Sequence, residues 1–169
     1  KNYESVIVVC LEGGKMNFPG NVSVYSLGKT GAESGFISRI KYVFNFYRNI
    51  FKEIWHYDSV FVHMNQEYVI LGFPFWKIFG KKIMFWRNHP AGNIFTDLAV
   101  FVSDVVFCTS KFSYTAKFKK TRIMPVGIDT DLFRKNESAD KFPNSVLYLG
   151  RISRIKNIAL LIEALNAVK

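Results

Sequence analysis

Short apolar runs alternate with longer segments of helical spacing along most of the chain. The runs are rich in β-branched and aromatic residues, which is typical of strands buried in a parallel sheet. They predict strands at residues 5–10, 21–27, 59–63, 83–86, 104–108, 121–125 and 145–149. Apolar positions three and four residues apart predict helices at residues 36–55, 67–79, 94–102, 110–118 and 158–168.

Three features of these helices carry specific expectations. In the helix over 36–55, one apolar stripe is expected to pack on the sheet; it consists of Ile37, Ile40, Phe44, Tyr47, Phe51 and Ile54. Pro74 is expected to interrupt the helix over 67–79, because proline lacks the N–H that a helix interior needs. Ser110 is expected to be the N-cap of the helix over 110–118.

The order of the elements predicts an α/β fold, a Rossmann-like parallel sheet with helices on both faces. Residues 134–144 are polar and aperiodic, so we expect a linker there. It would join an incomplete first domain, over 1–133, to the first strand and helix of a second domain, over 145–169. The chain starts without a methionine and stops in or just after a helix, so both ends are expected to be cut.

Composition narrows the class of protein. With 49% apolar and 17% aromatic residues, the chain is too hydrophobic to be disordered. No apolar run reaches the roughly 18–20 residues of a membrane span, so we expect a cytoplasmic protein, peripheral at the inner face of the membrane if membrane-associated. Cys10 and Cys108 lie in apolar runs and are expected to be buried thiols, without a disulfide or a metal site.

The charge indicates acidic partners. Lys and Arg number 23 against 13 Asp and Glu, a formal net charge of +10. Phosphate-bearing ligands and anionic lipid both fit this excess. Nucleic acid is not expected, because the cations are scattered along the chain and no recognised nucleic-acid motif is present.

Residues directly after predicted strands are the candidates for ligand binding, because ligands bind beyond the carboxyl ends of parallel strands. In the first domain they are His63, Arg87, Asn88, His89, Ser110, Gly127 and Asp129. For His89 the alternative is a capping or loop histidine. From its residues alone, the segment after Gly127 is a rigid connector, in which Asp129 bonds its own backbone and Ile128, Leu132 and Phe133 hold it to a core.

A second candidate site follows the predicted strand over 145–149. Gly150 lets a ligand approach the backbone closely, and the next helix offers a positive N-terminus. Arg151 and Lys156 flank that point and suit two phosphates. The alternative is a solvated basic loop without a ligand.

Both segments together resemble glycosyltransferase family four. The resemblance rests on Pro-x-Gly-Ile-Asp-Thr-Asp-Leu-Phe over 125–133, then Leu-Tyr-Leu-Gly-Arg-Ile-Ser-Arg-Ile-Lys-Asn over 147–157 and Leu-Leu-Ile-Glu-Ala-Leu over 160–165. Less specific similarity extends over nearly all of the chain. The resemblance implies the GT-B fold, in which two Rossmann-like domains face each other across a cleft. The parent would be a hexosyltransferase-type enzyme of envelope polysaccharide or glycolipid synthesis.

What the resemblance implies for the reaction is transfer of a sugar from a nucleotide diphosphate sugar to an acceptor hydroxyl, with retention. Gly150, Arg151 and Lys156 match the family's grip on the donor diphosphate, and His89 resembles the histidine that contacts the donor sugar. No cofactor or metal is expected, and the acceptor would be lipid-linked or a saccharide. The family's Gly-rich first loop and its paired glutamates would lie before Lys1 and after Lys169, so this chain alone is expected to be inactive.

Other interpretations remain beside this one. The chain could be a non-catalytic remnant that binds a membrane or a partner, or part of a sugar-nucleotide epimerase of the same fold. The helix over 36–55 is relevant to membrane binding, because Tyr42, Phe46 and Trp55 lie outside the apolar stripe that is expected to pack on the sheet. With Arg39, Lys41, Arg48 and Lys52 between them, these aromatics suit an anionic lipid surface; the alternative is an ordinary core helix with a solvated basic face.

Overall fold

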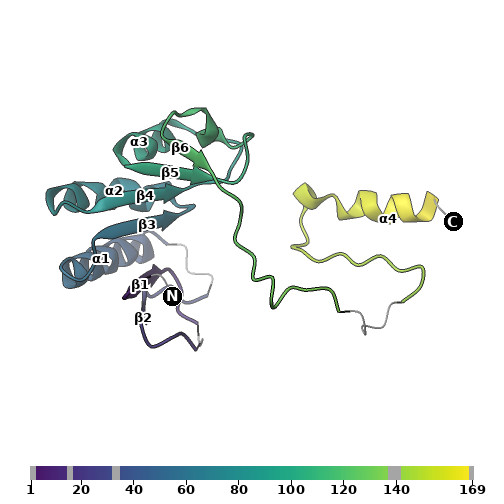
Figure 1. Ribbon diagram of the computed structural model, residues 1–169, viewed down its shortest axis with the longest axis horizontal. Coiled ribbons are helices and arrows are strands. Elements are labelled where there is room, and N and C mark those ends of the chain that lie inside the picture. The colour runs from purple at the N-terminus through teal and green to yellow at the C-terminus, as the bar shows by residue number, and fades with distance from the viewer. Residues whose placement is uncertain (1–2, 15–16, 32–34, 137–141, 168–169) are drawn as a thin grey trace. The chain divides into compact units, whose positions relative to one another are not determined.

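The computed structural model describes residues 3–14, 17–31, 35–136 and 142–167 (Figure 1). The chain divides into two compact units, Lys1–Gly127 and Ile128–Lys169. The first unit is α/β and contains only parallel strand pairs among its described residues, as the apolar runs predict. Part of the predicted linker, residues 137–141, and the predicted helix end at Val168 lie outside the described residues.

The strands of the first unit form two parallel sheets. One pairs β1 (Val6–Cys10) with β2 (Val22–Ser26). The other has the order β3 (Ser59–His63), β4 (Lys82–Trp86), β5 (Val105–Cys108) and β6 (Thr121–Ile123). All six predicted strands of this part are confirmed, although the last ends at Ile123 and does not reach Pro125.

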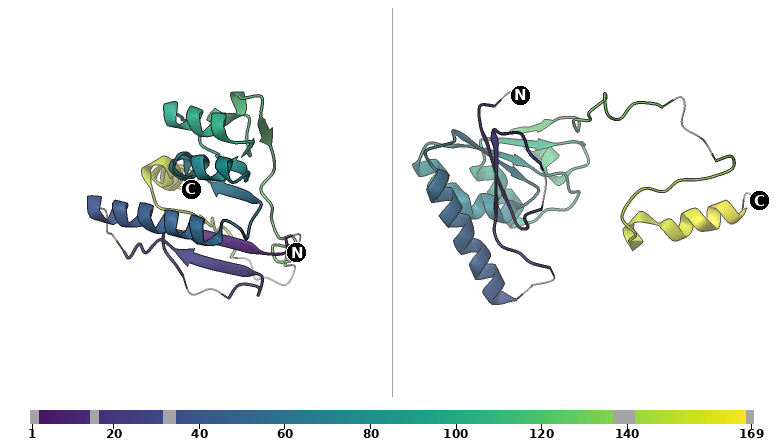
Figure 2. Two further views of the ribbon diagram at one scale, coloured as in Figure 1. Left: turned by 90° about the vertical axis from the view of Figure 1, so that its left-hand side faces the viewer. Right: turned by 90° about the horizontal axis from the view of Figure 1, so that it is seen from below.

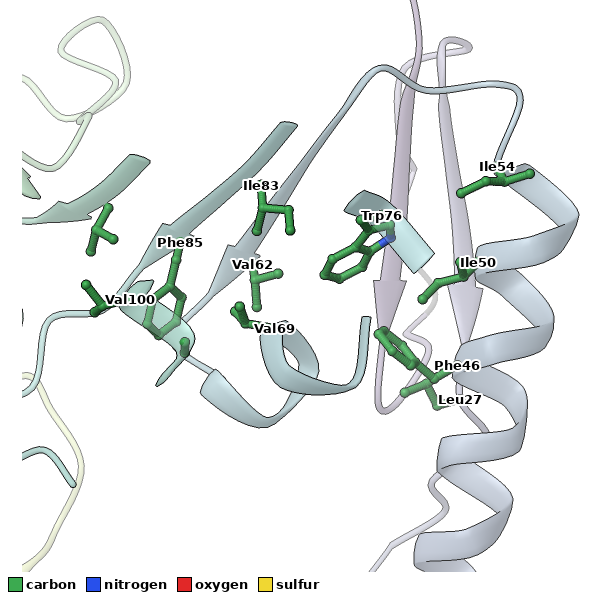
Figure 3. Close-up of a cluster of buried hydrophobic side chains, with 12 residues drawn as sticks. Leu27, Phe46, Ile50, Ile54, Val62, Val69, Trp76, Ile83, Phe85 and Val100 are labelled. Atoms are coloured by element: carbon green, nitrogen blue, oxygen red, sulfur yellow. The ribbon is translucent and has the colours of Figure 1, made fainter. Parts of the chain in front are cut away.

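Three α-helices accompany these strands: α1 (Phe36–Glu53), α2 (Gln66–Ile78) and α3 (Ile94–Val102). Because β3 to β6 follow one another in sequence order, right-handed connections place their helices on the same face of the sheet. That face buries Val62, Ile83 and Phe85 (Figure 3). It also buries Val106. Helices on both faces were expected, but among the described residues the packing of α2 and α3 is confined to this one.

The opposite face of the four-stranded sheet carries a row of aromatic rings. Phe61, His63, Trp86 and Phe107 are neighbours there, with ring centroids 6.3–6.5 Å apart. Phe61 is 51% exposed. The row is a consequence of strand alternation, since residues two apart on one strand point to the same face.

Trp76 is the centre of the core that joins α1 to α2 (Figure 3). It is 3% exposed, meets the ring of Phe46 edge-on and donates its indole N–H to the Tyr57 hydroxyl at 3.1 Å. Its ring lies directly over Gly72, where an added Cβ would overlap the ring atoms. Gly72 is therefore needed for this packing.

The face that α1 buries differs from the predicted stripe. The buried residues are Phe46, Asn49, Ile50 and Ile54. From the predicted stripe, Ile54 is buried and Tyr47 packs against the core as expected, whereas Ile37, Ile40, Phe44 and Phe51 are exposed. Apolar residues occupy most of the circumference of this helix, so spacing alone did not decide its orientation. Contacts with Trp76 and Leu27, together with a hydrogen bond from Asn45 to the Leu27 carbonyl, decide it.

Pro74 does not interrupt the second predicted helix. Helix α2 runs continuously from Gln66 to Ile78 with the proline inside it. Loss of one backbone hydrogen bond costs less than the burial that the helix gains on both sides of this point. Val69 and Trp76 provide that burial.

The second unit contains one α-helix among its described residues, α4 (Ile158–Ala167), preceded by the 3₁₀ turn η2 (Arg154–Lys156). The strand predicted over 145–149 is absent from the described structure, and Val146, Leu147 and Leu149 are exposed. A strand needs a hydrogen-bonded neighbour, and the described part of this unit provides none.

Acid is expected to destabilise the first unit through two carboxylates. A hydrogen bond from the Tyr25 hydroxyl lowers the pKa of Glu53 below its ordinary 4.5. Burial by itself would raise the pKa of Asp104, but hydrogen bonds from the Ile83 N–H (2.7 Å) and Lys77 (2.6 Å) outweigh it and place the pKa below 3.8. Both pKa values are lower folded than unfolded, so the stability they provide is present above pH 4.5 and is lost as the pH falls through the folded values.

Urea titrations at a series of pH values measure this effect. Replacing Asp104 by Asn should lower the free energy of unfolding at neutral pH by about 1 kcal/mol and flatten its fall in acid. Asp58 is a matched control, since its side chain makes no hydrogen bond or ion pair in the described part of the chain. An equal loss in Asp58→Asn would contradict the role given to Asp104.

Candidate functional site

The carboxyl edge of the four-stranded sheet gathers several of the predicted residues. Strand β4 leads into the loop over 87–93, and the Arg87 N–H donates to the Phe107 carbonyl at 3.0 Å. The Arg87 carbonyl accepts two hydroxyl hydrogen bonds, from Ser113 (3.0 Å) and Thr115 (3.1 Å), both buried. This segment is thereby tied to the chain that follows β5.

Asn88 connects the ends of three neighbouring strands. Its side-chain oxygen accepts from the Thr109 N–H at 3.2 Å, just beyond β5. Its own N–H points to the Met64 sulfur at 3.3 Å, just beyond β3. The amide thus holds the loops together, and its side chain is exposed at the edge of the sheet.

His89 is exposed in the same loop, and its backbone is held by a hydrogen bond from the Tyr114 N–H (2.9 Å). Its Nδ1 atom lies 3.1 Å from the Ala91 N–H and 3.0 Å from the Ala91 carbonyl, so it accepts from one or donates to the other according to the tautomer. Both contacts use Nδ1. This arrangement orients the ring and leaves Nε2 for a ligand or for water.

The guanidinium of Arg87 serves the backbone around it. It donates to the carbonyls of Met64 (3.4 Å) and Ala91 (3.2 Å). Its buried Nε has no hydrogen-bond partner within the described ranges. His63 ends β3 opposite Trp86, and its ring belongs to the aromatic row, with its centroid 6.5 Å from that of Phe61 and 6.4 Å from that of Trp86.

Ser110 does not cap a helix. The predicted helix over 110–118 is replaced by the 3₁₀ helix η1 (Tyr114–Lys117), and the Ser110 hydroxyl accepts from the Phe112 N–H in a tight turn. The hydrogen bonds of Ser113 and Thr115 to Arg87 explain the difference. They hold this segment against the end of β4 in a conformation that a regular helix from residue 110 would not allow.

Sequence reasoning missed a polar cluster where α2 and α3 begin. Thr96 donates its hydroxyl hydrogen to Gln66 at 2.6 Å, and Gln66 in turn donates to Asn93 at 3.3 Å. Asn93 caps α3 by a reciprocal pair of bonds with Thr96. An Asn three residues before a Thr at a helix start is a detectable capping signal, whereas the partnership with Gln66 has no local pattern.

Gly92 is the tightest point of the loop. An added Cβ would overlap the ring of Tyr114, which itself donates to Asp97 at 2.9 Å and lies under the Lys117 ammonium. Gly92→Ala should therefore displace the Tyr114 ring and lower the free energy of unfolding by about 1–3 kcal/mol. Gly20, with open space around it, is the control. Chemical denaturation compares the two, and equal stabilities would contradict the close contact.

The remaining candidates belong to the end of the first unit and to the second. Gly127 has open space around its Cα. The Asp129 carboxylate accepts from the N–H groups of Asp131 and Leu132, both at 3.0 Å, so it forms the expected backbone turn. Ile128, Leu132 and Phe133 do not hold the segment to a core, since each is at least 67% exposed.

The loop before α4 presents the two predicted phosphate ligands. Arg151 and Lys156 are exposed, and the Lys156 N–H closes a turn on the Ser153 carbonyl. Asn157 adopts a left-handed conformation (φ 49°) directly before the helix. A Cβ added to Gly150 would lie 2.8 Å from the Tyr148 hydroxyl. That hydroxyl donates to the Arg151 carbonyl.

No group of His, Cys, Asp and Glu that could hold a metal ion occurs among the described residues. Cys108 is buried and Cys10 is half-buried, and both are free thiols. No described helix combines the length and the apolar character needed to cross a membrane.

Comparison with protein-family models and with curated proteins gave no match. The structure itself defines the fold class: an α/β unit with parallel sheets and helices packed on them, compatible with a Rossmann-like fold. Its carboxyl edge holds Arg87, Asn88 and His89 in one braced loop.

Proposed function

We propose that this chain is part of a GT-B glycosyltransferase resembling family four, which moves a sugar from a nucleotide diphosphate sugar to an acceptor hydroxyl with retention. The single observation behind the proposal is the order of features along the chain. A parallel-sheet unit with a braced loop at its carboxyl edge precedes the Gly-Ile-Asp turn at 127–129, and a basic Gly-Arg loop at 150–156 directly precedes α4.

The chemistry of the second loop suits a diphosphate. Arg151 offers two parallel N–H donors and Lys156 a compact charge, and both precede the positive N-terminus of α4. Departure of a nucleoside diphosphate develops negative charge, which cations held in place stabilise. Gly150 would let the diphosphate approach the backbone if the Tyr148 hydroxyl, which lies over it and bonds to the Arg151 carbonyl, moves aside.

The first unit would supply the acceptor side. His89, with Nε2 available, would contact the donor sugar as the resemblance implies; Asn88 lies in the same loop and Ser110 in the loop after β5. These roles depend on the proposal and extend to the whole enzyme of which the chain would be a part.

Ligand-detected NMR on the whole chain tests the proposal. Uridine and guanosine diphosphates should give saturation-transfer signals that inorganic pyrophosphate abolishes and that a short DNA duplex leaves unchanged. Displacement by the duplex and not by pyrophosphate would favour a nucleic-acid-binding protein. Absence of any diphosphate signal would contradict a donor loop in this chain.

A membrane surface is the proposed location of the acceptor. Of the three aromatics outside the predicted stripe, which were expected to face it, Trp55 is exposed and the other two are not. Phe46 is buried and Tyr42 packs against the core. Instead, the first half of α1 exposes Phe36, Ile37, Ile40 and Phe44, and Arg39 lines a shallow apolar groove among them. Lys52 is engaged with Tyr25 and Glu53.

Binding to phosphatidylglycerol vesicles at low salt measures this contribution. Replacing Arg39 and Arg48 together by Gln should weaken binding about tenfold to thirtyfold, since each cation near the surface contributes about 1 kcal/mol. Lys111→Gln with Lys119→Gln removes the same charge outside α1 and should have less effect. Equal weakening by both pairs would mean that net charge, and not α1, directs binding.

A further inference from the structure

Among the described residues, no strand pairs with the facing edges of β1 and β3, where the two parallel sheets are separated by a break. In β1 the Val6 N–H donates to Asn21 and the Cys10 carbonyl accepts from Leu27, so alternate residues from Val6 bond to β2. In a parallel strand the intervening residues direct both N–H and C=O the other way. Ile7 and Val9 therefore direct their backbone groups away from β2.

The same alternation leaves an open edge on β3. The Asp58 carbonyl accepts from Lys82 and the Met64 N–H donates to Trp86, which assigns the even-numbered residues of this segment to β4. Ser59, Phe61 and His63 thus direct their N–H groups away from the four-stranded sheet, as do the carbonyls of Ser59 and Phe61, whereas the His63 carbonyl accepts from the Asn65 N–H at 2.9 Å. Figure 1 and the left view of Figure 2 both show β1 on the side of its sheet toward β3.

Helices α1 and α2, which accompany the two sides of this break, pack directly against each other. The Phe46 ring lies 4.9 Å from that of Tyr68 and 6.1 Å from that of Trp76, and the Tyr47 hydroxyl donates to the Leu71 carbonyl. If β1 and β3 were neighbours at the usual strand spacing, helices centred over the strands they connect would be about 7 Å apart. One additional strand gives about 10 Å, the spacing that helices with large side chains between them adopt.

We propose that an extended apolar polypeptide segment occupies this break and adds to β1 and β3 at once as one parallel strand. Only a polypeptide backbone offers alternating donors and acceptors to both edges. On one face its side chains would pack against the core around Trp76. On the other face they would extend the side of the sheet that carries the aromatic row, so the residues on both faces must be apolar. The proposal does not depend on glycosyl transfer.

Amide hydrogen exchange of the ¹⁵N-labelled chain is the first test. The N–H groups of Ile7, Val9, Ser59, Phe61 and His63 should exchange rapidly. Those of Val8 and Val62, which point into existing sheets, should be slower by about tenfold or more. Equal protection of both groups in a chain shown by ultracentrifugation to be monomeric would mean that the break is closed, and would overturn the proposal. Equal protection in a dimer would assign the break to a second copy and also overturn it.

A peptide supplies the second test. The probe has five alternating valines and isoleucines, the length of β1, between terminal lysines. It should slow exchange at all five open-edge amides by about tenfold or more. The control peptide has the same sequence but is N-methylated at the second and fourth apolar residues. It therefore lacks the N–H donors for one of the two strand edges and should not slow the exchange. Slowing by neither peptide, or equally by both, would overturn the proposal.

Discussion

Replacing Trp76 with alanine is expected to lower the free energy of unfolding of the first unit by about 3–5 kcal/mol. The indole fills the space between α1 and α2, is 3% exposed and makes a hydrogen bond with the Tyr57 hydroxyl. Its removal leaves a large cavity beside Phe46 and an unpaired Tyr57 hydroxyl. Urea denaturation followed by circular dichroism measures the loss.

Trp55→Ala is the matched control. This tryptophan is 76% exposed and makes one edge-on contact with Phe79, so its loss should cost no more than about 1 kcal/mol. Trp76→Phe keeps a large ring and should retain a measurable transition if the alanine variant does not fold. Similar losses in Trp76→Ala and Trp55→Ala would contradict the central position given to Trp76.

The second large effect concerns the loop before α4 and rests on the proposed function. Arg151→Ala and Lys156→Ala should each weaken binding of a nucleoside diphosphate about tenfold to a hundredfold, because each removes a charge-assisted contact of about 1.5–3 kcal/mol. Both side chains are exposed, so neither substitution removes buried contacts. Isothermal titration with uridine diphosphate measures the change.

Arg154 provides the control within the same loop. It carries the same charge as Arg151 and is also exposed, but it is not one of the residues matched to the donor diphosphate. Arg154→Ala should leave affinity within about threefold of the original, the loss expected from general electrostatics in salt. If all three variants lose affinity equally, the loop attracts anions by net charge and has no specific diphosphate site.

The strands of the first unit were predictable because a continuous apolar run has few alternatives in a small domain. Val6–Cys10 and Ser59–His63 agree with their predicted positions to within one residue. The run over 145–149 has the same character but forms no strand, since pairing depends on a neighbour that composition cannot reveal. The local sequence pattern indicates which segments can form strands, and the presence of a neighbouring strand determines which of them do.

Helix orientation was less predictable. The stripe through Ile40 and Phe44 has helical spacing, yet the core selected the face with Phe46 and Ile50. Where apolar residues surround a helix, amphipathicity has no single direction. The choice depends on shape, here on the fit of Phe46 against Trp76.

The candidate site was predictable in part. Arg87, Asn88 and His89 were found because they directly follow a strand. The residues that hold them were not found, since Ser113 and Thr115 bond to Arg87 across 26 and 28 positions in the sequence. Hydroxyl–carbonyl contacts over such distances leave no periodic signal.

The bracing of this loop also affects how a ligand would bind there. Its backbone is fixed through the Arg87 carbonyl, the Asn88 amide and the His89 carbonyl, each bonded to chain beyond β5. Ordering a mobile loop would subtract about 1–2 kcal/mol per residue from any binding energy. Here that entropy has already been lost on folding, so a ligand at this edge would meet a preorganised surface, and its affinity would reflect the side chains it contacts.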